Sequence, residues 1–376
     1  MPRLSILSYD YPPNDGGISR LVSTVVNELS RRGRQIEVLT LAADGRPGLT
    51  RPQISTQEVS RSKLQRDIAT FVYLRRLPSG IPVLPTVWSP EGALAYLARR
   101  TNSILMAHGN EVMPYPDGLR YFVKNWLRRK TLSSARSVIC NSRYTEHLVQ
   151  AISPEANTIV ITPGVDAARF KPVENELLAK QQFQLPTDRR IILSVSRMDA
   201  YKGHDVVLNA LAQMPAERRE TLHYVVAGRG SHLDSLKALA ASLGLSNSIT
   251  WLGFVADENL PTLYGCADLF VLCTKEDPQA RGVEGFGMVF LEAQAAGVPV
   301  IGTRVGGIPD AVEEGEGGWL IEQDDVSALR LHLERLSIDI LPFKEQGLRG
   351  RQRALTKGSW ELYVSKLLSV LDIKNA

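Results

Sequence analysis

Residues 284–293 read EGFGMVFLEA, which places a glycine-rich loop directly before an apolar run. The run predicts a helix over residues 287–296, between predicted strands at 269–273 and 299–302. The free N–H groups and partial positive charge at a helix start suit a diphosphate, and glycine lets the backbone approach it closely. The stretch therefore predicts one strand–helix–strand unit of a parallel sheet, with an anion site at the start of the helix.

The same alternation of strand and helix extends in both directions along the chain. In the C-terminal half, strands are predicted at 191–196, 223–227 and 249–252, and helices at 205–213, 231–243 and 260–266. In the N-terminal half, strands are predicted at 4–8, 36–41, 103–107 and 137–140, and a helix at 18–31. This pattern favours an α/β protein with two doubly wound parallel sheets, which bind ligands beyond the carboxyl ends of their strands. NAD enzymes, periplasmic binding proteins and one class of glycosyltransferases share that architecture, so the fold alone does not identify the function.

A stretch without a strand pattern separates the two halves. We expect an N-terminal domain over residues 1–165, a linker over 166–186 and a C-terminal domain over 187–358. Apolar residues at helical spacing predict a last helix within the segment 359–376.

Composition is that of an ordinary globular protein, with 44% hydrophobic and 22% charged residues among 376. No apolar run reaches the roughly 18–20 residues of a membrane span. The chain starts on a strand pattern without the apolar stretch of a signal peptide, and its three cysteines are widely spaced in apolar contexts. We therefore expect a cytoplasmic protein whose cysteines are core residues.

Positive charge is concentrated in the first half. Residues 1–185 hold 24 Lys and Arg against 15 Asp and Glu, a net of +9, which leaves 20 against 25, a net of −5, for the remainder. A basic half suggests an anionic partner such as a membrane surface or a phosphate-bearing acceptor, although a merely solvated basic surface is an equal alternative. The segments 61–76 and 120–130 combine cations with apolar residues and are the candidates for membrane contact.

Residues 284–293 resemble the E-x7-E region of glycosyltransferase family 4, and the resemblance covers nearly the whole chain. It implies a GT-B fold, in which two Rossmann-like domains face each other across a cleft and the segment 359–376 packs back on the first. It also implies that Glu284 contacts the donor sugar and Glu292 the ribose. The resemblance further implies donor contacts, chiefly from the backbone, at Phe286, Gly287, Met288 and Val289. Without it, a capping acid and an ordinary surface glutamate would explain the two carboxylates.

Two cations follow a predicted strand in residues 194–203, which read SVSRMDAYKG. Departure of a nucleoside diphosphate leaves negative charge, and without a metal Arg197 and Lys202 must neutralise it. Solvated surface charge is the alternative, but the position after a strand matches the phosphate-binding Arg and Lys of the family.

Two loops of the first half carry further candidates. Gly16 and Gly17 form a tight glycine pair that in the family closes on the donor phosphates. His108 follows an apolar strand, where the family has a histidine that contacts the donor sugar. Some relatives have a second histidine where this chain has Asn110, which leaves acceptor contacts there open.

Five further positions carry less information. Gly228 precedes Arg229, which either touches the nucleotide or is simply exposed. Gly253 and Phe254 resemble the family's base-binding edge, and Asp166 corresponds to the entrance of the cleft, on the acceptor side.

Motifs of other chemistries are absent from the sequence. It contains no Asp-x-Asp motif, no His or Cys cluster with metal-ligand spacing, no G-x-G-x-x-G fingerprint and no P-loop. We therefore expect no metal and no cofactor, and no nucleic-acid partner.

The residues and the resemblance together predict a retaining hexosyltransferase. It would move a hexose from a nucleoside-diphosphate sugar to a lipid-linked or polysaccharide acceptor. GDP-mannose is slightly favoured over UDP-sugars, because residues 284–297 look like those of phosphatidylinositol mannosyltransferases. No nucleophile is identified, which favours attack from the face the leaving group departs from. The alternatives are a non-catalytic nucleotide-sugar-binding protein and a GT-B relative such as a sugar epimerase. Peripheral association with the inner face of the cell membrane is left open.

Overall fold

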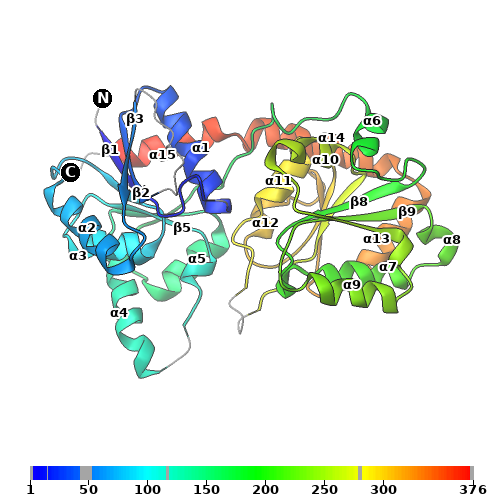
Figure 1. Ribbon diagram of the computed structural model, residues 1–376, viewed down its shortest axis with the longest axis horizontal. Coiled ribbons are helices and arrows are strands. Elements are labelled where there is room, and N and C mark those ends of the chain that lie inside the picture. Colours follow the sequence, from blue (N-terminus) through cyan, green and yellow to red (C-terminus); the bar gives the residue numbers. More distant parts are fainter. Residues whose placement is uncertain (1–2, 15, 43–52, 116–117, 278–281, 373–376) are drawn as a thin grey trace. The chain divides into compact units, whose positions relative to one another are not determined.

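The computed structural model describes residues 3–14, 16–42, 53–115, 118–277 and 282–372 (Figure 1). The chain forms two compact units: Met1–Pro163 with Trp360–Ala376 make up unit 1, and Gly164–Ser359 make up unit 2. Both are α/β, and every pairing between their named strands is parallel.

The strands of unit 1 form two short sheets joined by one bridge between Val83 and Ser103. The orders are β3-β2-β1-β4 and β5-β6-β7. The strands are β1 (Leu4–Leu7), β2 (Ile36–Leu41), β3 (Ile54–Val59), β4 (Val83–Pro85), β5 (Ile104–Ala107), β6 (Ser137–Cys140) and β7 (Thr158–Val160). The helices are α1 (Gly17–Arg31), α2 (Lys63–Arg76), α3 (Ala93–Leu97), α4 (Leu119–Ser134), α5 (Arg143–Ile152) and α15 (Trp360–Asp372).

Alternate residues of these strands enter different cores, because successive side chains point to opposite faces of a sheet. Ile104 and Met106 pack with α1 and α15, whereas Leu105 and Ala107 pack with α4 and α5. Burial on both faces is what a parallel sheet requires. Although α15 follows unit 2 in the chain, it packs against α1 in unit 1.

Unit 2 has one six-stranded sheet in the order β10-β9-β8-β11-β12-β13. The strands are β8 (Arg190–Val195), β9 (Leu222–Ala227), β10 (Ile249–Gly253), β11 (Leu269–Leu272), β12 (Val300–Thr303) and β13 (Gly318–Ile321). The helices are α6 (Glu176–Gln182), α7 (His204–Ala212), α8 (Ala216–Arg219), α9 (Leu233–Ser242), α10 (Leu260–Gly265), α11 (Met288–Ala295), α12 (Ile308–Ala311), α13 (Val326–Ile338) and α14 (Leu341–Lys357). Figure 1 shows α7, α9 and α13 on one face of this sheet and α10, α11, α12 and α14 on the other.

Strand order reverses direction between β8 and β11. The chain runs outward from β8 through β9 to β10, and then returns to the other side of β8 as β11. The loops that follow β8 and β11 therefore diverge, which opens the place where doubly wound sheets bind ligands.

The segment 166–186, which the sequence indicates as a linker, packs into unit 2. Phe170, Ala179 and Leu185 are buried in its core, and α6 lies within the segment. Its apolar side chains are interrupted by prolines and polar residues, so they show neither a helical nor a strand period. The short strand β13 was also not predicted. It begins at Gly318, where an added Cβ would stand 2.2 Å from the main-chain oxygen of Val300.

Gly203, on the loop after β8, lies closely against the end of β11, and this contact can be tested. It has φ +70°, and an added Cβ would lie 1.8 Å from the main-chain oxygen of Cys273. Gly244 has nearly the same φ, +69°, with nothing within 4 Å of such an atom. We expect Gly244→Ala to cost about 1–2 kcal/mol of stability from backbone strain alone. Gly203→Ala should cost more than about 4 kcal/mol, because the overlap adds to that strain.

Thermal unfolding followed by circular dichroism compares the two variants, with roughly 2–4 °C expected per kcal/mol. Equal shifts in Tm would contradict the close approach of the two loops at Gly203.

Candidate active site

An ion pair between a buried lysine and a half-buried glutamate joins the two loops at the point where the strand order reverses. Lys202 follows β8 and Glu284 follows β11, and the Lys202 Nζ lies 2.7 Å from the Glu284 Oε2. Lys202 is 8% exposed. Burial disfavours its charged form, but the negative charge of Glu284 outweighs burial and raises the pKa of Lys202 above its ordinary value. The Lys202 ammonium is therefore charged at neutral pH, and the contact with Glu284 fixes it in place.

Glycines set the backbone on both sides of this pair. Lys202 ends a 3-10 turn, Ala200–Lys202, and Gly203 then starts α7 in a left-handed conformation. The Glu284 main-chain oxygen accepts a hydrogen bond of 2.8 Å from the N–H of Gly307, and an added Cβ on Gly306 would lie 2.4 Å from the same oxygen. Our sequence reasoning missed Gly306 and Gly307. Two glycines shortly before a helix with an early proline were the available signal.

Arg197 lies on the same loop as Lys202 but has an exposed side chain. Its guanidinium bonds the Tyr201 hydroxyl at 3.0 Å and the Asp199 carboxylate at 3.1 Å, with 69% of the side chain accessible. An exposed guanidinium can change partners at little cost and bind an incoming phosphate.

The start of α11 follows Glu284 directly. Gly287 precedes the helix with φ +96°, and an added Cβ there would lie 2.6 Å from the Phe290 ring. Met288 and Val289 form the first turn and are half-buried. The side chain of Phe286 is buried in the core of unit 2, so only its main chain is available to a ligand.

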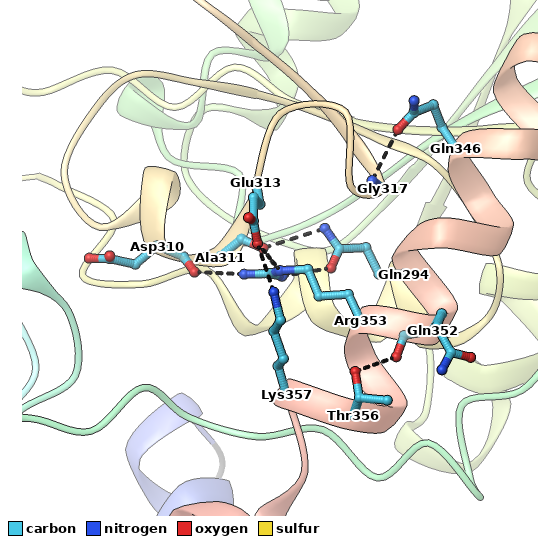
Figure 2. Close-up of polar contacts among 10 residues, drawn as sticks. All are labelled: Gln294, Asp310, Ala311, Glu313, Gly317, Gln346, Gln352, Arg353, Thr356 and Lys357. Atoms are coloured by element: carbon cyan, nitrogen blue, oxygen red, sulfur yellow. Dashed lines mark hydrogen bonds and ion pairs between the residues drawn. The ribbon is translucent and has the colours of Figure 1, made fainter.

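A polar network on α14 holds α11 from behind (Figure 2). Arg353 donates to the Gln294 side chain at 3.1 Å and to the Ala311 main-chain oxygen at 2.9 Å. It also pairs with Glu313 at 3.2 Å. Gln294 is fully buried in α11. This anchoring leaves α11 little freedom to shift when its first turn meets a ligand.

Glu292 lies in the middle of α11 and is 9% exposed. Its Oε2 accepts a hydrogen bond of 2.8 Å from the Tyr264 hydroxyl on α10. Tyr264 was not predicted, because it is distant in the sequence and its buried ring looks like ordinary core. The hydroxyl orients the carboxylate that is expected to bind the ribose.

The next loops along the sheet carry the remaining candidates of unit 2. Gly228 packs so closely that an added Cβ would lie 1.8 Å from the Ser196 main-chain oxygen, and its N–H bonds the Gly253 oxygen at 2.7 Å. Phe254 is exposed, and the Arg229 guanidinium lies 5.1 Å from the centre of its ring. The structure thus places Gly228, Gly253 and Phe254 beside the loop of Arg197.

A buried histidine supports the Lys202 loop from beneath. The His204 Nε2 lies 2.8 Å from the Ser196 hydroxyl, and its Nδ1 lies 2.9 Å from the Tyr224 hydroxyl. Tyr224 in turn lies 2.8 Å from the Ser194 hydroxyl. Burial, reinforced by the positive charge of Lys202, lowers the pKa of His204 to about 3. His204 is therefore a neutral structural group that the sequence did not single out.

The candidates of the first half lie in unit 1. Gly16 and Gly17 stand at the start of α1 and are exposed. His108 follows β5, and its Nε2 donates to the Thr86 main-chain oxygen at 2.9 Å. Asn110 begins the 3-10 turn after it. These residues extend from the carboxyl ends of β1 and β5.

Asp166 lies in unit 2, in an exposed turn. Its Oδ1 accepts hydrogen bonds from the N–H groups of Ala168, at 3.1 Å, and Arg169, at 3.0 Å. The Asp166 side chain therefore stabilises this turn.

In the described ranges, no three or more His, Cys, Asp or Glu side chains gather in a way that could hold a metal ion. Over the same ranges, no helix has the length and apolar content to cross a membrane.

Family comparisons match both halves of the chain. Residues 15–169 match the model described as Glycosyltransferase Family 4, and residues 176–346 match the model described as Glycosyl transferases group 1.

Curated relatives align along most of the chain. A GDP-mannose-dependent alpha-(1-6)-phosphatidylinositol monomannoside mannosyltransferase of Mycolicibacterium smegmatis is 28% identical, covering 98% of this chain and 97% of its own. A D-inositol 3-phosphate glycosyltransferase of the same organism is 29% identical over 86% of this chain and 81% of its own.

Solved structures share the fold at low identity. A sucrose-phosphate synthase from Thermosynechococcus elongatus has a TM-score of 0.82 at 23% identity, with 98% of each chain covered. Anabaena HepE in complex with UDP has a TM-score of 0.80 at 19% identity, with 99% of each chain covered.

The neutral His204 predicts a loss of stability in acid. Because its pKa lies far below the ordinary 6.5, the unfolded chain binds a proton that the folded chain rejects as pH falls from about 6.5 towards 3. At pH 5 this linkage costs about 2 kcal/mol relative to pH 7.5. We expect His204→Gln to have a smaller loss of Tm between pH 7.5 and pH 5 than the natural chain.

The matched control is His147→Gln, at an exposed histidine of α5. The interpretation of His204 is wrong if both variants lose Tm between these pH values as the natural chain does.

Proposed function

We propose a donor, an acceptor class and a mechanism for this chain, which belongs to the glycosyltransferases of the GT-B fold and uses a nucleotide sugar. The donor is GDP-mannose, with a UDP-sugar as the second candidate. The acceptor is a lipid-linked glycan or a polysaccharide. The single observation that carries the proposal is the largely buried Lys202–Glu284 pair beside the start of α11. The GDP-mannose-dependent relative that aligns over 98% of the chain supports the choice of donor.

Transfer proceeds with retention of configuration and without a metal. An acceptor hydroxyl oxygen attacks the anomeric carbon on the face that the diphosphate leaves. The bond from that carbon to the diphosphate breaks with its electron pair on the leaving oxygen, and the acceptor proton passes to the diphosphate. Lys202, Arg197 and the N–H groups at the start of α11 neutralise the charge that develops there. The absence of an assigned nucleophile supports this course over a covalent intermediate.

Glu284 has a second role beside its ion pair. Lys202 and Gly307 fix its carboxylate and its main chain, so its other carboxylate oxygen can bind and orient donor-sugar hydroxyls. Glu292 binds the ribose, with Tyr264 holding it. In unit 1, main-chain N–H groups at Gly16 and Gly17 bind a substrate phosphate, and His108 contacts the donor sugar.

Steady-state transfer assays in EDTA test the donor, the metal independence and Lys202 together. We expect GDP-mannose to support faster transfer to a lipid-linked acceptor than UDP-glucose does, with product of unchanged anomeric configuration by NMR. Lys202→Ala should lower kcat by about 10²–10³, by analogy with removal of one preorganised charge stabiliser.

Lys237→Ala removes an exposed lysine of α9 and should leave kcat unchanged. Near-natural turnover of Lys202→Ala would sink the assignment of Lys202, and activity lost in EDTA but restored by a divalent cation would sink metal independence. Tight donor binding with no turnover on any acceptor would favour the non-catalytic alternative, and conversion of the donor sugar to an epimer would favour an epimerase.

Peripheral binding to an anionic membrane is the second part of the proposal. Two helices of unit 1 expose apolar side chains on one face: Leu64 and Ile68 on α2, and Phe122, Val123 and Trp126 on α4. Both helices pack against α3. Cations accompany both faces, namely Lys63, Arg75, Arg76, Lys124, Arg129 and Lys130. Apolar rings next to cations are the pattern of helices that lie in a lipid headgroup region.

A groove beside α4 extends this surface. It is lined by Tyr115, Phe122, Trp126, Leu148 and Ile152, among others. Its apolar lining suits the acyl chain of an anionic lipid, which would place a lipid-linked acceptor close to unit 1.

Vesicle sedimentation tests this surface. The double variant Phe122→Ser with Trp126→Ser should bind vesicles of about 30% phosphatidylglycerol roughly tenfold more weakly than the natural chain, because two apolar rings no longer enter the interface. Binding by the natural chain should also weaken as salt rises. Leu348→Ser, at a leucine of α14 that is 70% exposed in unit 2, is the control and should bind as before. No binding by the natural chain even at low salt would overturn the membrane proposal.

A further inference from the structure

A buried carboxyl group lies in unit 1, outside the residues assigned so far. Glu91 belongs to the irregular turn Trp88–Gly92 that follows β4, the strand beside β1. Strand order reverses between β1 and β4 in unit 1 as it does between β8 and β11 in unit 2. Glu91 therefore stands where a doubly wound sheet opens towards a ligand.

The environment of Glu91 is costly for a carboxylate. The residue is 2% exposed, and its Oε1 accepts a hydrogen bond of 3.1 Å from the Tyr9 N–H, just after β1. Its Oε2 is buried and has no hydrogen-bond partner among the residues that the structure describes. The hydroxyls of Ser8 and Thr86, at the ends of β1 and β4, are also buried and have no hydrogen-bond partner among the described residues. An apolar residue would pack here at lower cost, so the carboxyl group needs another reason.

A series of hydrogen bonds leads from Glu91 to the start of α1. Glu91 holds the main chain of Tyr9, whose carbonyl oxygen accepts 2.9 Å from the Asn14 side chain. The Asn14 main-chain oxygen accepts 2.5 Å from the Ser19 hydroxyl, in the first turn of α1. The Tyr9 ring is fixed as well, because its hydroxyl lies 2.6 Å from that of Thr70 on α2. The loop that ends at Gly16 and Gly17 is thus held from Glu91 at one end and from Ser19 at the other.

We propose that Glu91 is a positioning residue, whose ionised carboxylate holds the Tyr9 main chain and through Asn14 and Ser19 sets the loop that presents Gly16 and Gly17. Its effect on transfer rests on the proposed function, in which Gly16 and Gly17 bind a substrate phosphate. Its effect on the loop does not depend on that function.

The charge of Glu91 changes close to neutral pH. Burial raises its pKa to about 7, a shift that Asp10 adds to and that the main-chain N–H groups of Glu91 and Tyr9, together with Arg66, oppose. The titratable and charged groups around it are Tyr9 and Asp10 on the loop after β1 and Arg66 and Asp67 on α2. An ionised carboxylate accepts a stronger hydrogen bond than a neutral carboxyl, so the hold on Tyr9 tightens as pH rises through about 7.

The contribution of Glu91 to the free energy of unfolding falls as pH rises, whereas its hydrogen bond to Tyr9 strengthens. Because the folded pKa is raised above the ordinary value, the folded chain retains a proton that the unfolded chain releases, and Glu91 contributes less stability as pH rises from about 4.5 through 7. Glu91→Gln, which is neutral and of the same shape, should therefore loosen the loop at pH 8 without lowering Tm. A residue with a merely structural role would lower both together.

Hydrogen exchange of the full chain, compared at equal pH, tests the proposal without substrate. At pH 8, the amides of Tyr9, Asp10, Tyr11 and Asn14 should exchange roughly fivefold faster in Glu91→Gln than in the natural chain, with Tm equal or higher. At pH 6 the two chains should exchange alike. Asn14→Ala breaks the series beyond Glu91 and should speed exchange of the same amides at both pH values. Glu58→Gln, at an exposed glutamate of β3, is the control.

The pH profile of kcat/KM gives the second readout. It should rise through about pH 7 in the natural chain and stay nearly flat in Glu91→Gln. Unchanged exchange of residues 9–14 at pH 8 overturns the positioning role, whatever the turnover. Faster exchange throughout unit 1 in Glu91→Gln, together with a lower Tm, also overturns the positioning role. The expected exchange result in a chain that shows no transfer on any donor leaves the positioning role standing and overturns the proposed function.

Discussion

The ion pair between Lys202 and Glu284 is the interaction on which the candidate site of unit 2 depends. It joins a loop that leaves β8 to a loop that leaves β11, at the one place in the described sheet where neighbouring strands send their chains in opposite directions. A buried pair of this kind is a poor source of stability, because desolvation of both charges offsets most of their attraction. In the proposed function its value lies in placement: the ammonium is kept for a leaving diphosphate, and the carboxylate is held still for a sugar.

Close backbone contacts make this placement possible. Gly203, Gly228 and Gly306 each stand where a Cβ would overlap a main-chain oxygen of a neighbouring loop. The loops are therefore packed backbone against backbone, with no side chain between them to adjust. The polar groups beneath them, from Ser194 through Tyr224 to His204, satisfy one another. The site consequently reaches its geometry before any ligand arrives, which is the condition for electrostatic stabilisation at low reorganisation cost.

Sequence patterns predicted much of this arrangement, and the exceptions share a physical cause. Alternating strands and helices in both halves were visible because each strand is a short apolar run bounded by loop residues, as at 269–273. Lys202 and Glu284 were found because their motifs resemble a family, not because the spacing shows that they touch. The packing of residues 166–186 into unit 2, the buried side chain of Phe286 and the support from Tyr264 and His204 were not predicted. Each depends on which distant segment lies opposite, and local periodicity carries no record of that. Glu91 is the extreme case, since nothing around it in the sequence distinguishes it from a surface glutamate.

The return of α15 to unit 1 has a consequence for how the protein is made. Tyr363, Val364 and Leu367 complete the core that α1 begins, and Arg34 pairs with Asp372 at 2.7 Å. Unit 2 is one continuous piece of chain, whereas unit 1 is split around it. During synthesis, unit 2 can therefore close its core while that of unit 1 still lacks a wall. Since translation proceeds at about 5–20 residues per second, α1 waits on the order of twenty seconds or more for its partner helix. The half of the chain with the most positive charge thus completes its core only after α15 has been made.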